Sequence, residues 1–186
     1  MYKIKFFSFI IAVEVVVIVV LSVLFFTDSL TTQTNSKKII FNEEIIYTKG
    51  TDIPFTGRML DTLDNKLIVE FNVVNGFKQG EFYLSKMDGS YAVLGHMNKN
   101  KNDGAWKYFY DSGQLECAGS FNNDEPSGKW IWYYKNGLMK CEGNYISGKP
   151  VGQWIKYDQA GNTSTVVNYQ FGEVVSYILL NTPTNI

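Results

Sequence analysis

Two neighbouring stretches of this chain decide its fold. Residues 104–121 read GAWKYFYDSGQLECAGSF and residues 128–145 read GKWIWYYKNGLMKCEGNY, so glycines and aromatic residues recur after 24 positions. The period extends beyond these stretches in three glycine series: Gly80, Gly104, Gly128 and Gly152; Gly89, Gly113, Gly137 and Gly161; Gly95, Gly119 and Gly143. Several series with one period predict a repeat protein in which each copy contacts its neighbours.

Each repeat has the pattern of two strands joined by tight turns. Asp88-Gly89 and Asn136-Gly137 are dipeptides typical of a two-residue type I′ hairpin turn. Residues that accept positive φ mark a second turn series, at Gly76, Asn100, Asp124, Gly148 and Gly172. Apolar and polar residues alternate between the turns. We therefore expect an all-β fold over residues 45–180: an elongated antiparallel meander of stacked β-hairpins, closed by a strand over 171–180.

A two-residue turn at Ser112-Gly113 fixes the register of one hairpin. It places Trp106 opposite Gly119, Tyr108 opposite Cys117 and Tyr110 opposite Leu115. The neighbouring hairpins then place Phe82 opposite Gly95 and Trp130 opposite Gly143. A ring that covers a cross-strand glycine stabilises a sheet, so we expect each aromatic ring to cover the glycine that it faces.

The N-terminal residues have the pattern of a membrane segment. Residues 6–26 form a mainly apolar run of 21 residues, long enough as a helix to cross a bilayer core of about 30 Å. Lys3 and Lys5 precede the run, which predicts a cytoplasmic N-terminus and a repeat domain outside the cytoplasm. We assign residues 1–26 to a cytoplasmic tip and single-pass anchor, 27–44 to a linker and 181–186 to a tail.

Two alternatives concern this segment. The segment is either an uncleaved anchor or a cleaved signal peptide. A signal peptide has a shorter apolar core and a small-residue cleavage site, and only a poor site, Thr27-Asp28-Ser29, follows Phe26, which favours the anchor. Glu14 lies near the middle of the run, either as a carboxylate that the apolar helix tolerates or as a pairing site for a second membrane helix.

Composition narrows the function. Lys and Arg number 17 against 18 Asp and Glu, with no strongly basic cluster, which argues against a nucleic-acid partner. One histidine, His96, and two cysteines, Cys117 and Cys141, leave too few ligands for a typical zinc site and a single candidate base. We expect no metal, no cofactor and no enzymatic activity.

Three local features resemble functional motifs, but we interpret each of them as structural. Residues 143–150 read GNYISGKP, which resembles a phosphate-binding loop but has Pro150 where Ser or Thr is needed, so we expect no nucleotide. Cys117 and Cys141 are one repeat apart, about 10 Å across two strands, which is too far for a disulfide. His96 has no orienting partner in the sequence and is predicted to be a surface or cross-strand residue.

Aromatic residues form the best candidate for a binding site. A single-layer sheet cannot bury both faces, and an exposed aromatic surface usually marks an interface. The candidate binding face consists of Trp106, Tyr108, Tyr110, Trp130, Trp132, Tyr134 and Trp154. The same rings also have the spacing of a framework that holds adjacent repeats together.

The quoted repeats resemble MORN repeats (membrane occupation and recognition nexus), and more closely the bacterial variant of the YwqK-type antitoxin family. The resemblance spans about residues 45–175 and includes the Pro54-Phe-Thr-Gly57 stretch at its start. It implies a β-hairpin repeat fold and, for the antitoxin family, a protein that binds and neutralises a toxin. The chain departs from that pattern in having a membrane segment, which favours immunity against a toxin at the cell envelope.

The sequence as a whole predicts a membrane-anchored, non-catalytic protein-interaction module. A protein partner, with a toxin as the specific case, is the leading expectation. The alternative is a structural envelope scaffold or spacer that contacts lipid or glycan.

Overall fold

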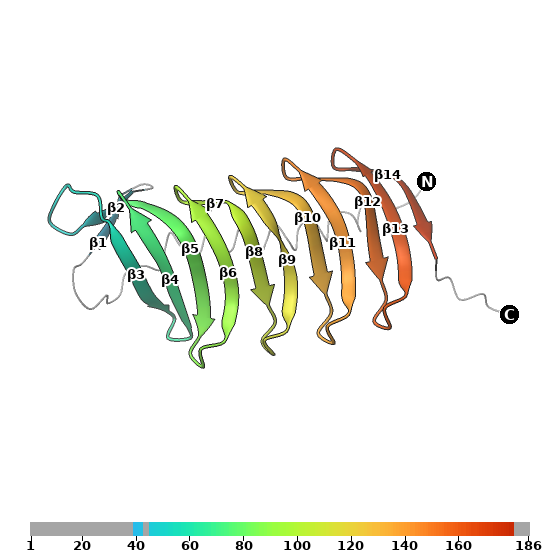
Figure 1. The fold of residues 1–186 in the computed structure, drawn as a ribbon, viewed down its shortest axis with the longest axis horizontal. Helices are drawn as coiled ribbons and strands as arrows, with labels where there is room; N and C mark the ends of the chain where they lie inside the picture. Colours follow the sequence, from blue (N-terminus) through green and yellow to red (C-terminus); the bar gives the residue numbers. More distant parts are fainter. Residues whose placement is uncertain (1–38, 43–44, 181–186) are drawn as a thin grey trace. The chain divides into compact units, whose positions relative to one another are not determined.

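The computed structural model describes residues 39–42 and 45–180 of the chain. This part contains a two-stranded sheet and a 12-stranded antiparallel sheet, whose strands follow one another in chain order (Figure 1). The smaller sheet consists of β1 (Ile39–Asn42) and β2 (Ile45–Thr48). The larger sheet consists of β3 (Gly57–Leu63), β4 (Leu67–Val74), β5 (Phe77–Lys86), β6 (Tyr91–Asn98), β7 (Lys101–Asn102), β8 (Gly104–Phe109), β9 (Leu115–Asn122), β10 (Glu125–Tyr133), β11 (Met139–Ile146), β12 (Lys149–Tyr157), β13 (Thr163–Gln170) and β14 (Glu173–Leu179). The predicted antiparallel meander of hairpins is confirmed for these residues.

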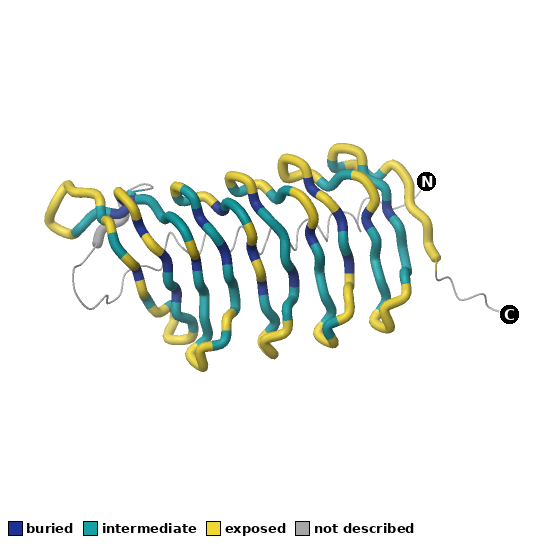
Figure 2. Tube along the Cα trace, viewed as in Figure 1, coloured by how far each residue is buried: buried dark blue, intermediate teal, exposed yellow. Residues whose placement is uncertain are grey.

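One face of the large sheet holds the core, and we call it the aromatic face. Its central row runs from strand to strand through Met59, Phe71, Phe82, Gly95, Trp106, Gly119, Trp130, Gly143, Trp154 and Val167. Every non-glycine member of this row is buried. Figure 2 shows the buried positions recurring along the successive strands. The rings contact one another across repeats: the ring centroids of Phe82 and Trp106, for example, are 5.5 Å apart.

The predicted register is confirmed, but the predicted covering ring is wrong. Trp106 pairs with Gly119 and Trp130 pairs with Gly143, as expected. Each of these glycines is nevertheless covered by the tryptophan of the following repeat: Trp130 lies over Gly119 and Trp154 over Gly143, while Trp106 covers Gly95. In two of the three cases the indole N–H supports this placement: that of Trp130 donates to the carbonyl of Ser120 and that of Trp106 to the carbonyl of His96, both on the preceding strand at 3.0 Å. The glycines therefore join consecutive repeats instead of completing single hairpins.

The hairpins at Gly89, Gly113, Gly137 and Gly161 do not have the predicted two-residue type I′ turns. In the second of them, the N–H of Tyr110 donates to the carbonyl of Gln114 and the N–H of Gly113 donates to that of Tyr110, both at 2.9 Å. Gly113 has φ of 83°, whereas Ser112 has no positive φ. A type I′ turn needs positive φ at both central residues, so this loop is a three-residue type I turn that ends in a glycine bulge.

A second irregularity restores the predicted register. The pairing shifts by one residue between Tyr108↔Cys117 and Phe109↔Leu115, so Glu116 is the extra residue of a β-bulge. The same shift recurs in the other hairpins at Ala92, Lys140 and Ser164. The extra residue compensates for the longer loop. Tyr108 therefore faces Cys117 as predicted, but Leu115 faces Phe109 instead of Tyr110.

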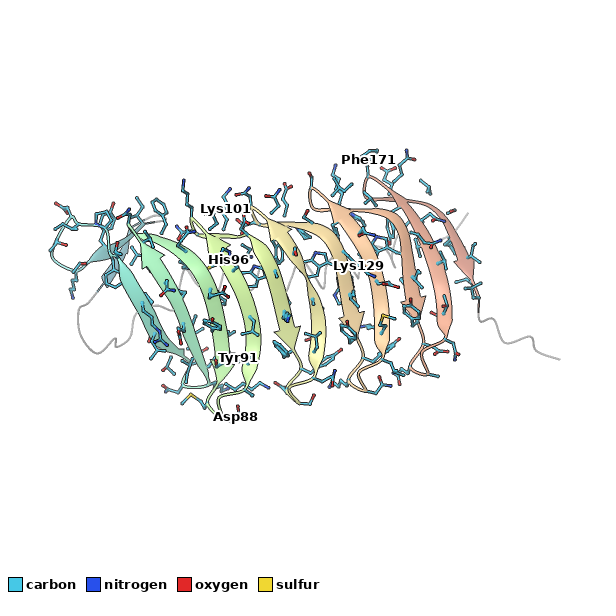
Figure 3. The ribbon with its side chains drawn as sticks, in the orientation of Figure 1. Asp88, Tyr91, His96, Lys101, Lys129 and Phe171 are labelled. Atoms are coloured by element: carbon cyan, nitrogen blue, oxygen red, sulfur yellow. The ribbon has the colours of Figure 1, made fainter. Side chains whose placement is uncertain are left out.

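Type I′ geometry occurs in the other turn series, at the opposite border of the sheet. Both central residues of these turns have positive φ: Asn75-Gly76, Lys99-Asn100, Asn123-Asp124, Ser147-Gly148 and Phe171-Gly172. The labelled side chains in Figure 3 mark the two borders, with Asp88 and Tyr91 at the three-residue loops and Lys101 and Phe171 at the type I′ turns.

The type I′ turns also bind consecutive repeats to one another. The N–H groups of Asn100, Asp124, Gly148 and Gly172 donate to the carbonyls of residues 22 positions earlier, which are Lys78, Asn102, Pro126 and Pro150. The side chains of Asn100 and Asp124 also accept the N–H of Lys78 and of Asn102, both at 2.7 Å. Of these four turns, the two with glycine, at Gly148 and Gly172, face proline, which has no N–H to donate. Donor and acceptor are thus present together or absent together.

The two ends of the repeat domain differ from its middle. At the start, Ile46 of β2 is buried and its N–H donates to the carbonyl of Gly76 at 2.9 Å, so β2 packs on the first type I′ turn. At the other end, β14 is the predicted closing strand. The short strand β1 begins at Ile39, inside the stretch assigned to the linker.

The membrane-segment prediction falls outside the described residues, together with Glu14 and the tail. Among residues 39–42 and 45–180, no helix is long and apolar enough to cross a membrane.

Candidate functional site

The seven residues of the predicted binding face divide into two groups. Trp106, Tyr108, Trp130 and Trp154 are only 1–6% exposed. Tyr110, Trp132 and Tyr134 are half-buried. All seven lie in the central part of the repeat domain, but only the second group presents open surface. Binding of a partner by these residues stays a prediction.

The two half-buried tyrosines connect neighbouring repeats. The hydroxyl of Tyr110 donates to the carbonyl of Tyr133 at 2.7 Å, and that of Tyr134 donates to the carbonyl of Tyr157 at 2.7 Å. One repeat earlier, Lys86 occupies the corresponding position, and its ammonium group donates to the carbonyl of Asp111 in the next hairpin at 2.8 Å. These side chains join neighbouring hairpins by hydrogen bonds. Like the buried rings, they therefore help to hold adjacent repeats together.

The opposite face of the sheet presents more accessible side chains. Its central row runs through Leu60, Glu70, Tyr83, Leu94, Lys107, Ala118, Ile131, Glu142, Ile155, Val166 and Ile178. From Tyr83 to Val166 these side chains are half-buried, except for the exposed Lys107. Five members of this stretch are aliphatic: Leu94, Ala118, Ile131, Ile155 and Val166. A charged residue separates them at Lys107 and at Glu142.

A polar cluster lies on this face across three strands. Glu142 accepts a hydrogen bond from the hydroxyl of Tyr157 at 2.7 Å and pairs with the ammonium group of Lys129 at 2.7 Å. The Lys129 and Tyr157 contacts hold the pKa of the Glu142 carboxyl below its ordinary value. The same hydrogen bond raises the pKa of Tyr157 to about 12. Both oxygens of Glu142 have partners, so this cluster stabilises the sheet and leaves no group poised for proton transfer.

The chemically reactive side chains considered from the sequence have structural surroundings. Burial raises the pKa of the Cys117 thiol to about 12 and that of Cys141 to about 11, and both thiols are free. His96 contacts the carbonyl of Asp103 through Nδ1 at 2.9 Å, which requires the proton on Nδ1. Among the described residues there is no group of three or more Cys, His, Asp or Glu side chains that could hold a metal ion.

Residues 143–150, which resemble a phosphate-binding loop, adopt a different structure. They join β11 to β12 through the type I′ turn at Ser147-Gly148. A phosphate-binding loop leads from a strand into a helix, whose N-terminal N–H groups point at the phosphate. The turn offers no such helix.

The opposite face was not singled out from the sequence. In the sequence, this face corresponds to the strand positions that alternate with those of the aromatic face. These positions have fewer aromatic residues and include charged ones, so they resemble an ordinary solvated surface. Only the register shows that Leu94, Ile131 and Ile155 share one row.

Comparisons with known proteins agree with the repeat architecture. The family model described as MORN repeat variant matches residues 102–123 and 126–147. The chain thus contains two MORN repeat variants, which suggest a protein or membrane interaction module. The search of curated proteins found no match.

Two of the solved structures that match this chain are only weakly similar to it. One is a crystal structure of a S. aureus TarM mutant in complex with Fondaparinux, alpha-GlcNAc-glycerol and UDP, with 11% identity and a TM-score of 0.24, covering 66% of this chain and 20% of that one. Another is a GtfA/B complex bound to UDP and GlcNAc, with 16% identity and a TM-score of 0.19, covering 76% of this chain and 25% of that one. This chain therefore matches a quarter or less of either structure, and TM-scores this low are no guide to its function.

Proposed function

We propose that this chain is a non-catalytic protein-interaction module, which residues 6–26 anchor in the cell membrane with the repeats outside the cytoplasm. Its specific form is an immunity protein that binds a protein toxin at the envelope. The MORN repeat match supports an interaction module, and the resemblance to the YwqK-type antitoxin family suggests the toxin.

The central row of the opposite face is the observation that favours a protein partner. Half-buried aliphatic side chains at Leu94, Ile131 and Ile155 alternate with Lys107 and Glu142 on one continuous surface. Protein interfaces combine apolar residues with a polar surround in this way. The aromatic face uses most of its rings to join repeats and offers less open surface.

Charge gives no support to the alternative of lipid contact. The chain has 17 Lys and Arg and 18 Asp and Glu, and residues 1–26 contain two Lys and one Glu. The remainder therefore has 15 basic and 17 acidic residues, a net charge of −2. Anionic lipid surfaces attract clusters of basic residues instead.

Binding can be tested with single substitutions on the two faces. The test partner is the purified product of a neighbouring gene that encodes a large secreted protein. Ile131→Glu should abolish its binding to the full chain in detergent while circular dichroism stays unchanged. Trp132→Ala is the matched variant on the aromatic face and should retain binding. Loss of binding only in Trp132→Ala would instead assign the interface to the aromatic face, and absence of binding by the unaltered chain would contradict the toxin-binding form.

Topology needs a separate measurement. A C-terminal alkaline phosphatase fusion of the full chain should be active and membrane-bound, and a C-terminal fluorescent fusion should be dark. The reverse result would place the repeats in the cytoplasm and contradict the envelope location.

A further inference from the structure

The large sheet ends at a strand with unusual exposure. Six of the seven residues of β14 are exposed. They include Val175, Tyr177, Ile178 and Leu179, and Leu180 follows, all large apolar side chains that are 49–58% exposed. Terminal units of repeat proteins usually have a polar outer surface. β14 instead has the composition of an interior strand.

The backbone of β14 is equipped to bind another strand. The N–H of Leu180 donates to the carbonyl of Ser164 at 2.9 Å, so Leu180 directs its main-chain groups toward β13. Inward and outward pairs alternate along an antiparallel strand, so Ile178 also faces β13, whereas Tyr177 and Leu179 direct their N–H and C=O groups outward. β14 has β13 as its only strand neighbour among the described residues.

The two borders of the sheet differ in charge. Edge strands usually avoid pairing by means of charged residues, proline or bulges. The first edge strand, β3, has Arg58 and Asp61. From Val174 to Leu180 the last strand has no charged residue and no proline. The last strand does have a bulge, at Val175. The stretch that follows it, from Ser176 to Leu180, has no bulge, charge or proline, so it lacks the protection that the charged residues give β3.

We propose that β14 binds β14 of a second copy of this chain, antiparallel, so that two repeat domains share one continuous sheet. Pairing of a strand with itself closes at two copies, whereas pairing of β14 with β3 would be open-ended and would add copies without limit. A pair centred on Ile178 places Tyr177 opposite Leu179 of the second copy, and their outward main-chain groups can bond reciprocally. The single charge of the strand, Glu173, is five positions from this centre, so the two Glu173 residues are separated by about 33 Å.

Cross-linking tests the contact directly. Ile178→Cys should form a disulfide-linked dimer on mild oxidation of the full chain in detergent, because the two introduced thiols face each other. The native thiols of Cys117 and Cys141 are buried and should not interfere. Met87→Cys is the control: this residue is 61% exposed at a hairpin turn far from β14. Equal cross-linking of both variants, or none by Ile178→Cys, would overturn the proposal.

Light scattering with size-exclusion chromatography gives an independent result. The unaltered chain in detergent should have the protein mass of a dimer, and the double variant Tyr177→Lys with Leu179→Lys should be monomeric, with dimer affinity reduced at least tenfold. The control Leu60→Lys places a lysine on the other edge strand and should remain dimeric. A double variant that stays dimeric would assign association to another segment, such as residues 6–26, and a monomeric unaltered chain would mean that something other than a second copy covers β14. Either result would overturn the proposal, and neither bears on toxin binding.

Discussion

At the scale of single residues, two junctions between repeats have a matched N–H donor and side-chain acceptor, at Lys78 with Asn100 and at Asn102 with Asp124. Asn102 is 4% exposed, and its N–H has the Asp124 carboxylate as acceptor at 2.7 Å. A buried N–H that loses its acceptor costs about 1–3 kcal/mol. Glycine in place of the Asn or Asp acceptor leaves no N–H without a partner only where the facing residue is proline, as at Pro126 and Pro150.

Asp124→Gly should therefore lower the free energy of unfolding by about 1–3 kcal/mol. The residue has φ of 70°, which glycine adopts more easily, so the measured loss underestimates the lost hydrogen bond. Asp124→Asn is the control, because it keeps an oxygen acceptor and should change stability little. Urea unfolding of the full chain in detergent, followed by tryptophan fluorescence, gives both values. Equal stability of the two variants would show that the side-chain acceptor does not matter.

The close contact of Trp130 with Gly119 predicts a second residue-scale effect. A methyl group at Gly119 would overlap the indole of Trp130, which is 1% exposed and has no room to move. Gly119→Ala should cost about 1–3 kcal/mol through overpacking. Ser120→Ala adds nothing to the aromatic face, keeps the carbonyl that binds the indole N–H, and should be nearly neutral in the same unfolding assay. A neutral Gly119→Ala would show that the ring can shift.

At the scale of the hairpin, the glycine, asparagine and aspartate series located the turns from Gly76 onward, but the turn type predicted for the Asp-Gly and Asn-Gly series is wrong. Asp-Gly and Asn-Gly suit a type I′ turn, and they also suit a type I turn followed by a glycine bulge. The deciding feature is the β-bulge at Glu116 and at the corresponding residues of the other hairpins, which no local sequence signal marks. Phe171 at φ of 49° shows the converse: an aromatic residue in a type I′ turn is not expected from its own preferences, and the pairing of β13 with β14 imposes it.

Acid should weaken the connection between β10, β11 and β12. Contacts with Lys129 and Tyr157 hold the pKa of Glu142 below its ordinary value, so the ionised carboxylate stabilises the folded chain. This stabilisation is complete above the unfolded pKa of about 4.3 and is lost as the pH falls through the lower folded value. Glu142→Gln should therefore be less stable than the unaltered chain at pH 7, and the difference should shrink by pH 3. Urea midpoints at both pH values measure it, with the exposed Glu81→Gln as control; a difference independent of pH would exclude the carboxylate as its cause.

At the scale of the whole repeat domain, the period predicted the strand order and the register, because both follow from where the turns fall. The period could not predict which face of the sheet is buried. The pattern predicts Trp106, Trp130 and Trp154 on a candidate binding face, but they are buried because each ring packs on the glycine of the preceding strand. That packing is a contact between repeats, which the pattern of one repeat does not contain. The proposed binding surface on the opposite face likewise depends on how neighbouring strands pair. The exposed edge at β14 depends on which strands lie beside it.

Removal of one whole repeat tests how repeats recognise one another. Repeat arrays tolerate such deletions because each unit contacts only its neighbours. Deletion of 100–123 brings Asp124 opposite Lys78, so acceptor again meets donor. Deletion of 124–147 has the same length but brings Gly148 opposite Asn102, whose N–H then lacks an acceptor. The first deletion should be more stable by about 1–3 kcal/mol in urea unfolding, although both should fold. Gly148→Asp in the second deletion should recover most of the difference; no recovery would mean that the matched turns do not select their neighbours.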